Sequence, residues 1–507
     1  MGRSTKFISG LAFGYVTIAI NVGYTLASIP IALHYLSKEE FGLWALITQI
    51  TAYLMLLEFG LSGSVARFLA DHKDHVHEEN YGKIIRTGHW IFSIQGLIIT
   101  LLAAGLSLPL ASFMKIPEDL QNTFAILLTI QTIFAALHLS TRTHGSILWS
   151  HQRHDIINIA SSLGLVMQFA VLWGGLAIGW KLNSLAFASF VNILVSLGIT
   201  IFANTRLGYY PPINKKNEKF DSAIFRQLFH FGSGLFVINI GNQLASASQV
   251  VIISRIMGLE AASTWSVATK ASSLSQTLVG RILDSSTPAL TEMSVRGEEE
   301  RLKKRFTDIV MITTAVAIGA MAGITLLNES MLKLWTSSKI FWDTLNNPLL
   351  GILILVTSVT RCYVAIAIIK RRITLIKYAS LFEGVGFVVS SCYLVSHFGF
   401  PGLLVAAIAS NLLFTGFYSI QFAYRQLHIP PLFTGRRWFQ FILIAGVITI
   451  TSFTLHTPAI HNLDPISYLL IATGALIGVI APAVWHFAFD RDTRIEIVSR
   501  VSGLLRR

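Results

Sequence analysis

Six charged side chains lie deep inside long apolar stretches of the sequence. They are Lys270, Arg281, Arg361, Glu58, Asp284 and Glu383. A charge at the centre of a membrane costs about 2.5–3.5 kcal/mol or more, so such residues mark functional sites by default. Basic groups at this depth could bind an anionic substrate, and carboxylates could bind a proton or a metal cation. The six residues are therefore candidates for a transport pathway.

The apolar stretch 264–290 carries two of these cations on one helix face. Lys270 and Arg281 are eleven residues apart, close to three helical turns. Asp284 follows Arg281 by three residues and could form an ion pair with it. The stripe could line a cavity that binds an anion. Alternatively, Arg281 and Asp284 form a structural pair, and Lys270 extends its amine towards the membrane surface.

Further arginines stand near the ends of other apolar stretches. The arginine fork suits phosphate oxygens, so Arg67 and Arg142 could join Arg281 and Arg361 in a basic vestibule. For Arg67 and Arg142, ordinary anchoring at the cytoplasmic membrane surface is the stronger explanation.

The carboxylates have two interpretations each. Glu58 precedes a Gly-Leu-Ser-Gly stretch at 60–63, and those glycines could permit bending. Glu58 could couple transport to a proton or sodium gradient, or it could pair with a cavity cation, which we slightly favour. Glu383 carries the same ambiguity, and Asp284 is the third candidate for ion coupling.

Two apolar stretches carry matching polar stripes that could contact sugar groups. Asn21 and Tyr24 lie in the first stretch, and Asn239, Asn242 and Gln243 lie in the stretch 232–257. Because the two stretches are equivalent in the repeat described below, their stripes should line a cavity from opposite sides. The alternative is hydrogen bonding between neighbouring helices.

No motif for nucleotide hydrolysis, zinc binding or serine hydrolase chemistry occurs. His72, His75 and His77 alternate with acidic residues near the end of the second stretch and could bind a metal weakly, but a solvated loop is the better interpretation. We expect no metal site, no cofactor and no enzymatic activity.

The composition requires a membrane protein. Of 507 residues, 53% are hydrophobic and 13% are charged, and the mean hydropathy is +0.61. Soluble proteins carry about 25% charged residues, so a soluble enzyme and a disordered chain are excluded. We expect an all-α integral membrane protein with about fourteen transmembrane helices, at residues 11–36, 43–69, 87–113, 121–145, 156–180, 182–205, 232–257, 264–290, 307–331, 349–369, 373–397, 402–424, 439–457 and 466–489.

The distribution of Lys and Arg sets the expected orientation. Most of the 39 basic residues fall in every second connecting segment, as the positive-inside rule requires when both termini are cytoplasmic. The net charge of +13 is therefore mainly an orientation signal and does not indicate binding to nucleic acid.

An internal repeat sets the expected architecture. The segment 13–28 (FGYVTIAINVGYTLAS) is similar to 231–246 (FGSGLFVINIGNQLAS), and the spacing continues through Arg142 and Arg361 and through Asn192 and Asn411. Six helices per copy predict two parallel six-helix lobes with pseudo-twofold symmetry. The expected parts are an N-terminal lobe at 1–206, a cytoplasmic linker at 207–230, a C-terminal lobe at 231–430, two extra helices within 431–489 and an amphipathic basic tail at 490–507.

The chain resembles a known family of exporters. The resemblance is carried by SKEEFGLWALITQITAYLMLLEFGLSGSVARFLA, RTHGSILWSHQRHDIIN and KFDSAIFRQLFHFGSGLFVINIGNQLAS, together with the expected fourteen helices. These features are similar to the polysaccharide-transport (O-antigen flippase) branch of the multidrug/oligosaccharidyl-lipid/polysaccharide exporter superfamily. The resemblance implies flipping of undecaprenyl-pyrophosphate-linked oligosaccharides from the inner to the outer leaflet of the bacterial inner membrane. It also implies a cationic central cavity, for which Arg281, Lys270 and Arg361 are the candidates.

The expected function is therefore a lipid-linked oligosaccharide flippase that works by alternating access. The expected partners are the lipid-linked substrate and membrane lipid, with a polysaccharide polymerase and a chain-length regulator as further candidates. A multidrug and toxin extrusion antiporter is the first alternative, although a cation carrier should favour carboxylates and aromatic groups. A lipid II flippase is the second. A membrane polymerase or ligase is disfavoured because the outer loops are short.

Overall fold

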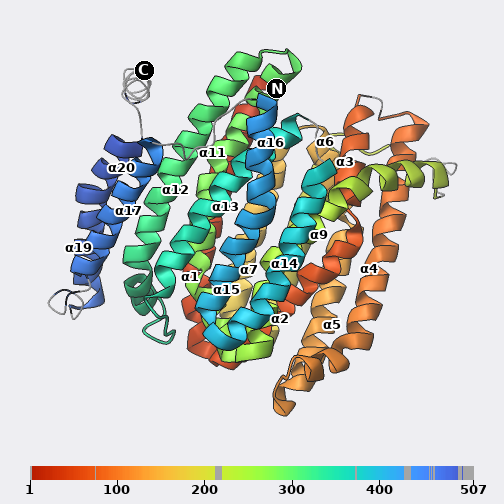
Figure 1. Cartoon of the computed structure of the whole chain (residues 1–507). Coiled ribbons are helices and arrows are strands. Elements are labelled where there is room, and N and C mark those ends of the chain that lie inside the picture. Colours follow the sequence, from red (N-terminus) through yellow and green to blue (C-terminus); the bar gives the residue numbers. More distant parts are fainter. Residues whose placement is uncertain are drawn as a thin grey trace. The chain divides into compact units, whose positions relative to one another are not determined.

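The computed structural model describes residues 3–74, 76–211, 220–370, 374–427, 436–455, 457, 460, 463–488 and 494. This part of the chain is helical and contains no strand (Figure 1). It forms two compact units, Met1–Ser263 and Thr264–Arg507, which are described separately.

The helices of unit 1 are α1 (Arg3–Tyr35), α2 (Lys38–Leu54), the 3-10 turn η1 (Met55–Glu58), α3 (Leu61–Asp71), α4 (Glu79–Phe113), α5 (Glu118–Ser140), α6 (Arg142–Ser150), α7 (His154–Ile178), α8 (Leu182–Arg206) and α9 (Ser222–Met257). Helix α10 (Leu259–Ala268) crosses into unit 2. Unit 2 continues with α11 (Lys270–Val295), α12 (Glu299–Trp335), α13 (Asn346–Ile369), α14 (Thr374–Phe398), α15 (Phe400–Asn411), the π-helix η3 (Leu412–Gly416), α16 (Phe417–Leu427), α17 (Arg436–Leu455), α19 (Pro465–Ala475), the π-helix η4 (Leu476–Ile480) and α20 (Ala481–Ala488).

Twelve helical stretches of the described residues are long and apolar enough to cross a membrane. Two further predicted spans, 264–290 and 439–457, coincide with α11 and α17. Helix α11 has sufficient length, with 26 residues, but its serine, threonine and charged side chains lower its hydropathy. Of α17, only Gly446–Leu455 forms a continuous described apolar helix. The count of fourteen and the cytoplasmic termini therefore stay predictions.

Local sequence explains where the helices of unit 1 begin. Ser37 caps α2, because its hydroxyl accepts from the Glu40 N–H at 3.0 Å while a Glu40 carboxylate oxygen accepts from the Ser37 N–H at 2.8 Å. This reciprocal pair satisfies two backbone donors that a helix start leaves free. Asp221 caps α9 in a similar way, through the N–H groups of Ala223 and Ile224.

Helix α9 belongs to the core of unit 1. It packs against α2, α3 and α4, and its Leu228 is fully buried in a hydrophobic cluster with Leu61, Tyr81 and Leu139. The compact units therefore divide between Ser263 and Thr264, after α9, whereas the predicted lobes divide at the 207–230 linker. The repeat itself, with lobes 1–206 and 231–430, stays a prediction.

The predicted linker is attached to unit 1 at its start. The Tyr81 hydroxyl donates to the Tyr209 carbonyl at 3.2 Å, and the Tyr209 ring stacks on His151 with 3.8 Å between ring centroids. The Tyr210 hydroxyl lies 2.8 Å from His144 Nδ1, and burial raises the pKa of Tyr210. Residues 212–219 of the linker lie outside the described residues.

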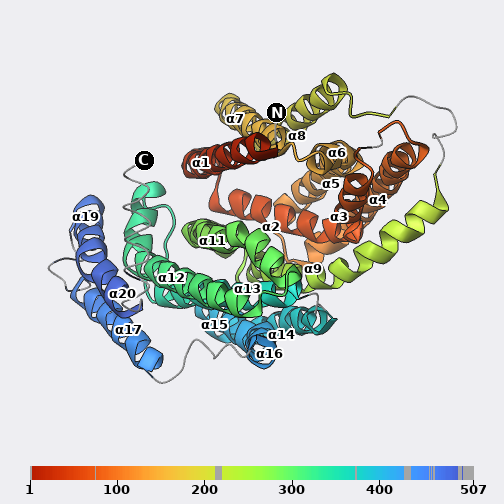
Figure 2. The same cartoon turned by 90° about the horizontal axis from the view of Figure 1, so that it is seen from above.

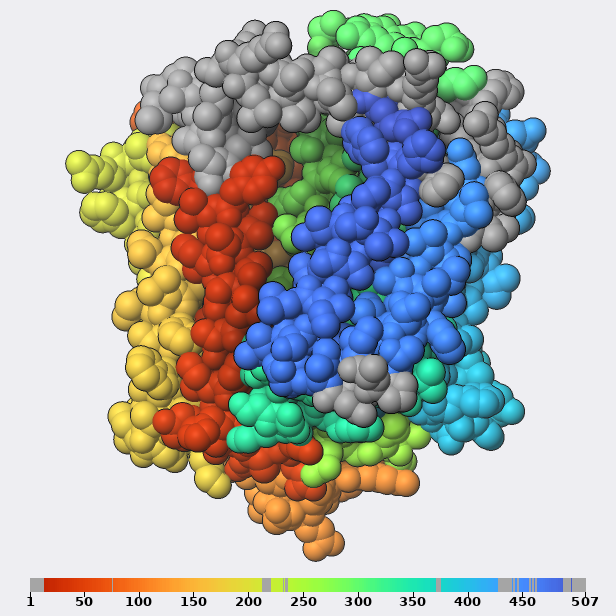
Figure 3. All heavy atoms as spheres, turned by 90° about the vertical axis from the view of Figure 1, so that its left-hand side faces the viewer, coloured from red at the N-terminus to blue at the C-terminus, as the bar shows by residue number. Residues whose placement is uncertain are grey.

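In unit 2, the last helices form an outer layer on α12. Helices α19 and α20 pack against α12, and α17 packs against α20 and α12, as Figure 2 shows. Figure 3 views the same blue segment from its outer face. The contact buries Ile318, Leu326, Ile448 and Tyr468 in one hydrophobic cluster. The predicted tail 490–507 lies outside the described residues, apart from Arg494.

Candidate functional site

The second membrane span is interrupted at two residues with left-handed backbone. Phe59 has a φ of 55° and Gly60 a φ of 70°, and a right-handed helix cannot continue through such residues. Helix α2 therefore ends in the tight turn η1, and α3 starts at Leu61. A Cβ atom on Gly60 would lie 3.0 Å from the Gly232 carbonyl oxygen of α9, so this position favours glycine.

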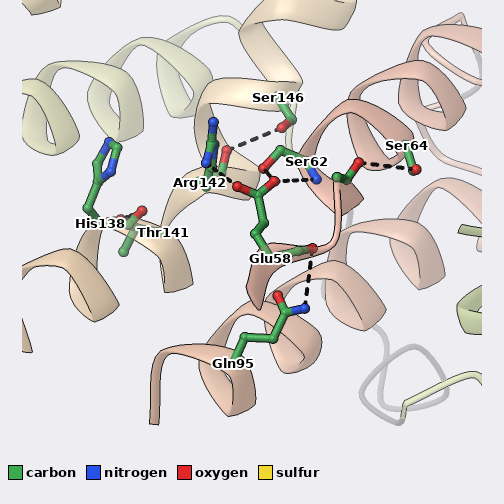
Figure 4. Close-up of polar contacts among 9 residues, drawn as sticks. Glu58, Ser62, Ser64, Gln95, His138, Thr141, Arg142 and Ser146 are labelled. Carbon is green, nitrogen blue, oxygen red and sulfur yellow. Dashed lines mark hydrogen bonds and ion pairs between the residues drawn. The ribbon is translucent and has the colours of Figure 1, made fainter. Parts of the chain in front are cut away.

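The interruption leaves the Ser62 backbone N–H open to the Glu58 carboxylate (Figure 4). Its Oε1 accepts from the Ser62 backbone N–H at 2.8 Å and from the Ser62 hydroxyl. Gln95 of α4 donates to the Glu58 carbonyl at 3.4 Å. Glu58 thus caps the start of α3, where a negative charge also interacts favourably with the helix dipole.

Arg142 approaches the same carboxylate from the junction of α5 and α6. Its Nη1 donates to Glu58 Oε2 at 2.5 Å, and the Glu58 side chain is only 13% exposed. Glu58 therefore pairs with a cation, as one of its two interpretations requires. Its role in ion coupling stays a prediction.

Unit 2 contains a second arginine–carboxylate pair. Arg361 of α13 donates through Nη2 to Asp284 Oδ1 of α11 at 2.7 Å. The guanidinium lies directly over Gly280 of α11, where a Cβ atom would be 2.5 Å from Arg361 Nη1. Any residue with a Cβ atom at position 280 would therefore clash with the Arg361 guanidinium in this position.

The partner of Asp284 differs from the one considered on sequence. Three-residue spacing suggested Arg281, but the carboxylate lies against Arg361 of the neighbouring helix. Along the described chain, no ion pair joins Arg281 to Asp284. Lys270, Thr277, Arg281 and Asp284 are all exposed on α11, so the predicted stripe is an exposed face of this helix.

Arg67 lies apart from the Glu58 pair. It forms an exposed contact with Asp71 one turn further along α3, at 3.5 Å. Such i,i+4 pairs contribute about 0.2–0.5 kcal/mol to a helix. This geometry agrees with a surface position for Arg67.

The polar stripe of α1 divides between two environments. Tyr24 accepts from Gln168 of α7 at 3.0 Å, and Gln168 in turn accepts from Asn192 of α8 at 2.6 Å. Thr17 likewise contacts Ser162 of α7. Tyr24 therefore bonds between helices, while Asn21 is exposed.

The corresponding stripe on α9 is more open. Asn239 and Asn242 are exposed, and Gln243 is half-buried. These amides have the donors and acceptors that sugar hydroxyls require. Their assignment to a substrate stays a prediction.

Glu383 has neutral partners. Asn411, the last residue of α15, donates through Nδ2 to Glu383 Oε1 at 2.8 Å, and its Oδ1 accepts from the Thr360 hydroxyl of α13 at 2.8 Å. The π-helix η3 begins at the next residue. Gly416 ends η3 close to the Asn411 carbonyl, where a Cβ atom would lie at 2.8 Å.

Within the described residues, no group of three or more His, Cys, Asp or Glu side chains is placed to hold a metal ion. His72 Nδ1 contacts the Phe68 carbonyl one turn earlier. His75 lies outside the described residues.

Several site residues were missed on sequence. Ser62 and Gln95 bind Glu58, Gly280 accommodates Arg361, and Asn411 binds Glu383. Asn411 had a usable signal, because Asn192 stands at the equivalent place of the repeat. The others are polar or small residues in apolar helices, whose partners depend on helix packing.

A family of polysaccharide biosynthesis proteins matches residues 34–345 of the chain. The succinoglycan biosynthesis transport protein ExoT of Rhizobium meliloti is 28% identical over 362 residues, which cover 67% of this chain and 66% of that protein. A putative O-antigen transporter of Shigella flexneri is 26% identical over 267 residues, which cover 49% of this chain and 57% of that protein. The matched regions thus span less than two thirds of either relative.

Solved structures show the same fold at low sequence identity. An inward-facing multidrug resistance MATE family transporter of the MOP superfamily has a TM-score of 0.68 at 12% identity and covers 80% of this chain and 94% of its own. The lipid II flippase MurJ in an inward closed conformation has a TM-score of 0.64 at 14% identity, covering 91% and 99%.

These comparisons confirm the resemblance carried by the sequence motifs. Twelve candidate spans make the protein a multi-pass membrane protein, and its fold is that of the MATE and MurJ transporters. Because residues 34–345 are more than half of its length, the chain belongs to the polysaccharide biosynthesis protein family.

Proposed function

We propose that the protein is a flippase of the bacterial inner membrane. It moves undecaprenyl-pyrophosphate-linked oligosaccharide units from the cytoplasmic to the outer leaflet by alternating access, for surface polysaccharide synthesis. The named activities of the two relatives, succinoglycan transport and O-antigen transport, support this substrate class. A transport role needs no catalytic group.

The charge on the exposed face of α11 is the observation that carries the proposal. Asp284 is engaged by Arg361 at 2.7 Å, so it does not neutralise Arg281, and Lys270 stands on the same exposed face. Lys270, Arg281 and the neighbouring Arg361 outnumber the single carboxylate of Asp284, so this surface of unit 2 carries a net positive charge. A pyrophosphate complements such a surface, because arginine binds phosphate oxygens through two parallel hydrogen bonds. A carrier of organic cations would need the opposite sign.

Another part of α11 borders an apolar pocket of about 500 Å³. Leu278 and Val279 line it together with Val316 and Gly319 of α12 and with Trp485 of α20. One helix thus offers cations to a headgroup and apolar side chains to a hydrocarbon chain. An isoprenoid-linked pyrophosphate has both parts.

Other parts of the proposal follow from the sequence. The transmembrane helices number fourteen when α11 and α17 are included, and both termini are cytoplasmic. A proton or sodium gradient supplies the energy, and a polysaccharide polymerase and a chain-length regulator act with the protein. A lipid II flippase would share the anionic headgroup and differs in its sugar.

The proposal is tested by deleting the gene and measuring undecaprenyl-pyrophosphate-linked oligosaccharide in each leaflet. We expect accumulation in the inner leaflet, which the wild-type gene and Arg281→Lys reverse and Arg281→Ala does not. Arg301→Ala is the matched control, because Arg301 is exposed and pairs with Glu298 outside this face. A deletion strain without accumulation but with increased sensitivity to cationic drugs would contradict the flippase and favour an extrusion antiporter.

A further inference from the structure

Glu383 is a half-buried carboxylate within a membrane span. It lies in the first half of the span Leu375–Phe398, and its side chain faces Asn411 at the end of α15. Thr415 of η3 is 94% buried, and its hydroxyl lies near this carboxylate without a hydrogen-bond partner among the described residues. Both neighbours are neutral. Glu58 and Asp284, by contrast, each have an arginine partner.

Among the described residues, no cation of the helices packed around Glu383 pairs with it, and Arg361 of α13 is engaged by Asp284. Helices α15 and η3 carry no titratable side chain, and α16 carries Tyr418, Tyr424 and, near its far end, Arg425. On α14 itself, Lys377 lies six residues earlier, which places it on a different helix face. A carboxylate without a cation is most stable in a membrane as the neutral acid.

In the predicted internal repeat, only the second half of the chain has a carboxylate at this position. The spacing that relates Asn192 to Asn411 also relates Ser196 to Thr415 and Gly164 to Glu383. In unit 1, Ser196 donates to Asn192 at 3.2 Å, and a Cβ atom on Gly164 would lie 2.4 Å from Asn192 Oδ1. Unit 1 therefore keeps the neutral residues of the cluster, and glycine stands in place of the carboxylate.

We propose that Glu383 is a proton-binding site at the junction of α14, α15 and η3. A proton from solution forms an O–H bond with one carboxylate oxygen and gives the neutral acid. Release returns the proton to solution and restores the carboxylate, with no change in oxidation state. The assignment of this proton to transport coupling rests on the proposed function, whereas proton binding itself does not.

The geometry favours a proton over a metal cation. Asn411 presents its Nδ2 donor to Glu383, while its Oδ1 accepts from Thr360. A sodium ion needs several oxygen ligands facing it, and an N–H group in the first position repels it. A carboxylic acid fits, because its carbonyl oxygen accepts from Asn411 and its O–H lies beside the Thr415 hydroxyl.

The position of the site explains how protonation changes the helix junction. The bond from Asn411 to Glu383 joins α14 to the residue that precedes the π-helix. Hydrogen bonds to an ionised acceptor are roughly twice as strong as bonds between neutral groups. Neutralising Glu383 therefore loosens α14 from α15 beside a π-helix, an element that often occurs at functional sites.

The test uses purified full-length protein without substrate. Infrared difference spectra between high pH and about pH 6, above the range near pH 4 in which ordinary carboxyls titrate, report a carboxylic acid band, and potentiometric titration over the same range counts the protons taken up. We expect wild type to show the band and to bind one proton more than Glu383→Gln, which lacks it. Glu383→Gln keeps the oxygen that accepts from Asn411, so it preserves the fold. Glu383→Asp should retain a band at a shifted position.

Glu329→Gln is the matched control, because Glu329 lies in the same unit but pairs with Lys333 at 2.7 Å. It should leave the titrating band unchanged. A band that persists in Glu383→Gln, or a band abolished by sodium at constant pH, would overturn the proton site. Because these measurements need no oligosaccharide, they stand even if the leaflet assay rejects the flippase.

Discussion

Arg142 and Arg361 match in the predicted internal repeat, and each donates to a carboxylate within its own compact unit. Arg142 binds Glu58 at a helix interruption, at 2.5 Å, and Arg361 binds Asp284 within a continuous helix, at 2.7 Å. The arginine is thus common to both halves, whereas the carboxylate comes from a different position in each. Both units therefore contain an arginine in an ion pair, and they differ in the helix position that supplies its carboxylate.

Replacing Gly280 with alanine should displace Arg361. The added Cβ atom would lie 2.5 Å from Arg361 Nη1, so the guanidinium must leave Asp284. Misplacing a binding group by about 1 Å can cost about 100-fold, and we expect a loss of 10- to 100-fold in flipping rate. Thermal stability should be unchanged or higher, because alanine favours a helix interior over glycine by about 1 kcal/mol.

Gly474→Ala provides the control for this variant, because nothing lies within 4 Å of a Cβ atom at that position of α19. Flipping in a reconstituted vesicle assay should match wild type. Equal losses in both variants would show that helix stiffening, and not the displacement of Arg361, lowers the rate.

Exchanging the charges of the second pair should separate stability from transport. The side chains of Arg361 and Asp284 are 51% and 45% exposed, and exposed pairs contribute about 0–1 kcal/mol. We therefore expect Asp284→Arg with Arg361→Asp to melt close to wild type in detergent. Flipping should fall at least about tenfold, because the cation no longer projects from α13. Full flipping by the exchanged protein would make the pair purely structural.

Gly60→Ala should destabilise unit 1. A left-handed backbone costs a residue with a Cβ atom about 1–2 kcal/mol, and this Cβ atom also meets the Gly232 carbonyl at 3.0 Å. We expect a lower melting temperature in detergent. Gly23→Ala is the control, because α1 has nothing within 4 Å of that position, and it should melt at or above the wild-type temperature.

Gly319→Leu should fill the apolar pocket of unit 2. Gly319 lines that pocket on α12, and its Cβ position is unobstructed. The protein should fold, but a lipid-linked substrate should flip more slowly, while a water-soluble pyrophosphate sugar should bind with unchanged affinity. Gly105→Leu on α4, also unobstructed, should leave both measurements unaltered. Weaker binding of the soluble ligand in Gly319→Leu would place the pocket at the headgroup.

Much of the fold could be predicted from the sequence, because a membrane span needs about 20 apolar residues in a row. All twelve apolar spans coincide with predicted stretches. Helix boundaries were harder: the stretch 43–69 is interrupted at Phe59 and Gly60. The glycines at 60–63 indicated a place where the helix could bend, but the left-handed backbone of Phe59 and the close approach of Gly60 to Gly232 of α9 had no local signal.

The candidate site was predictable in its residue types and less so in its partners. Charges at membrane depth identified Glu58, Asp284 and Arg361, which the structure places in ion pairs. Spacing along one helix suggested Arg281 as the partner of Asp284, because such patterns report only neighbours on the same helix. The actual partner comes from α13, and its approach depends on the missing side chain of Gly280.

The packing of α9 also has a consequence for biogenesis. The buried cluster of unit 1 includes Leu228 beside Leu61 and Tyr81, and α9 ends at Met257. During synthesis, the helices before the linker are complete before α9, the helix that covers their buried cluster, has been made. A ribosome that stalls within residues 212–219 would leave a half-exposed core for membrane proteases, although six apolar spans had already been made.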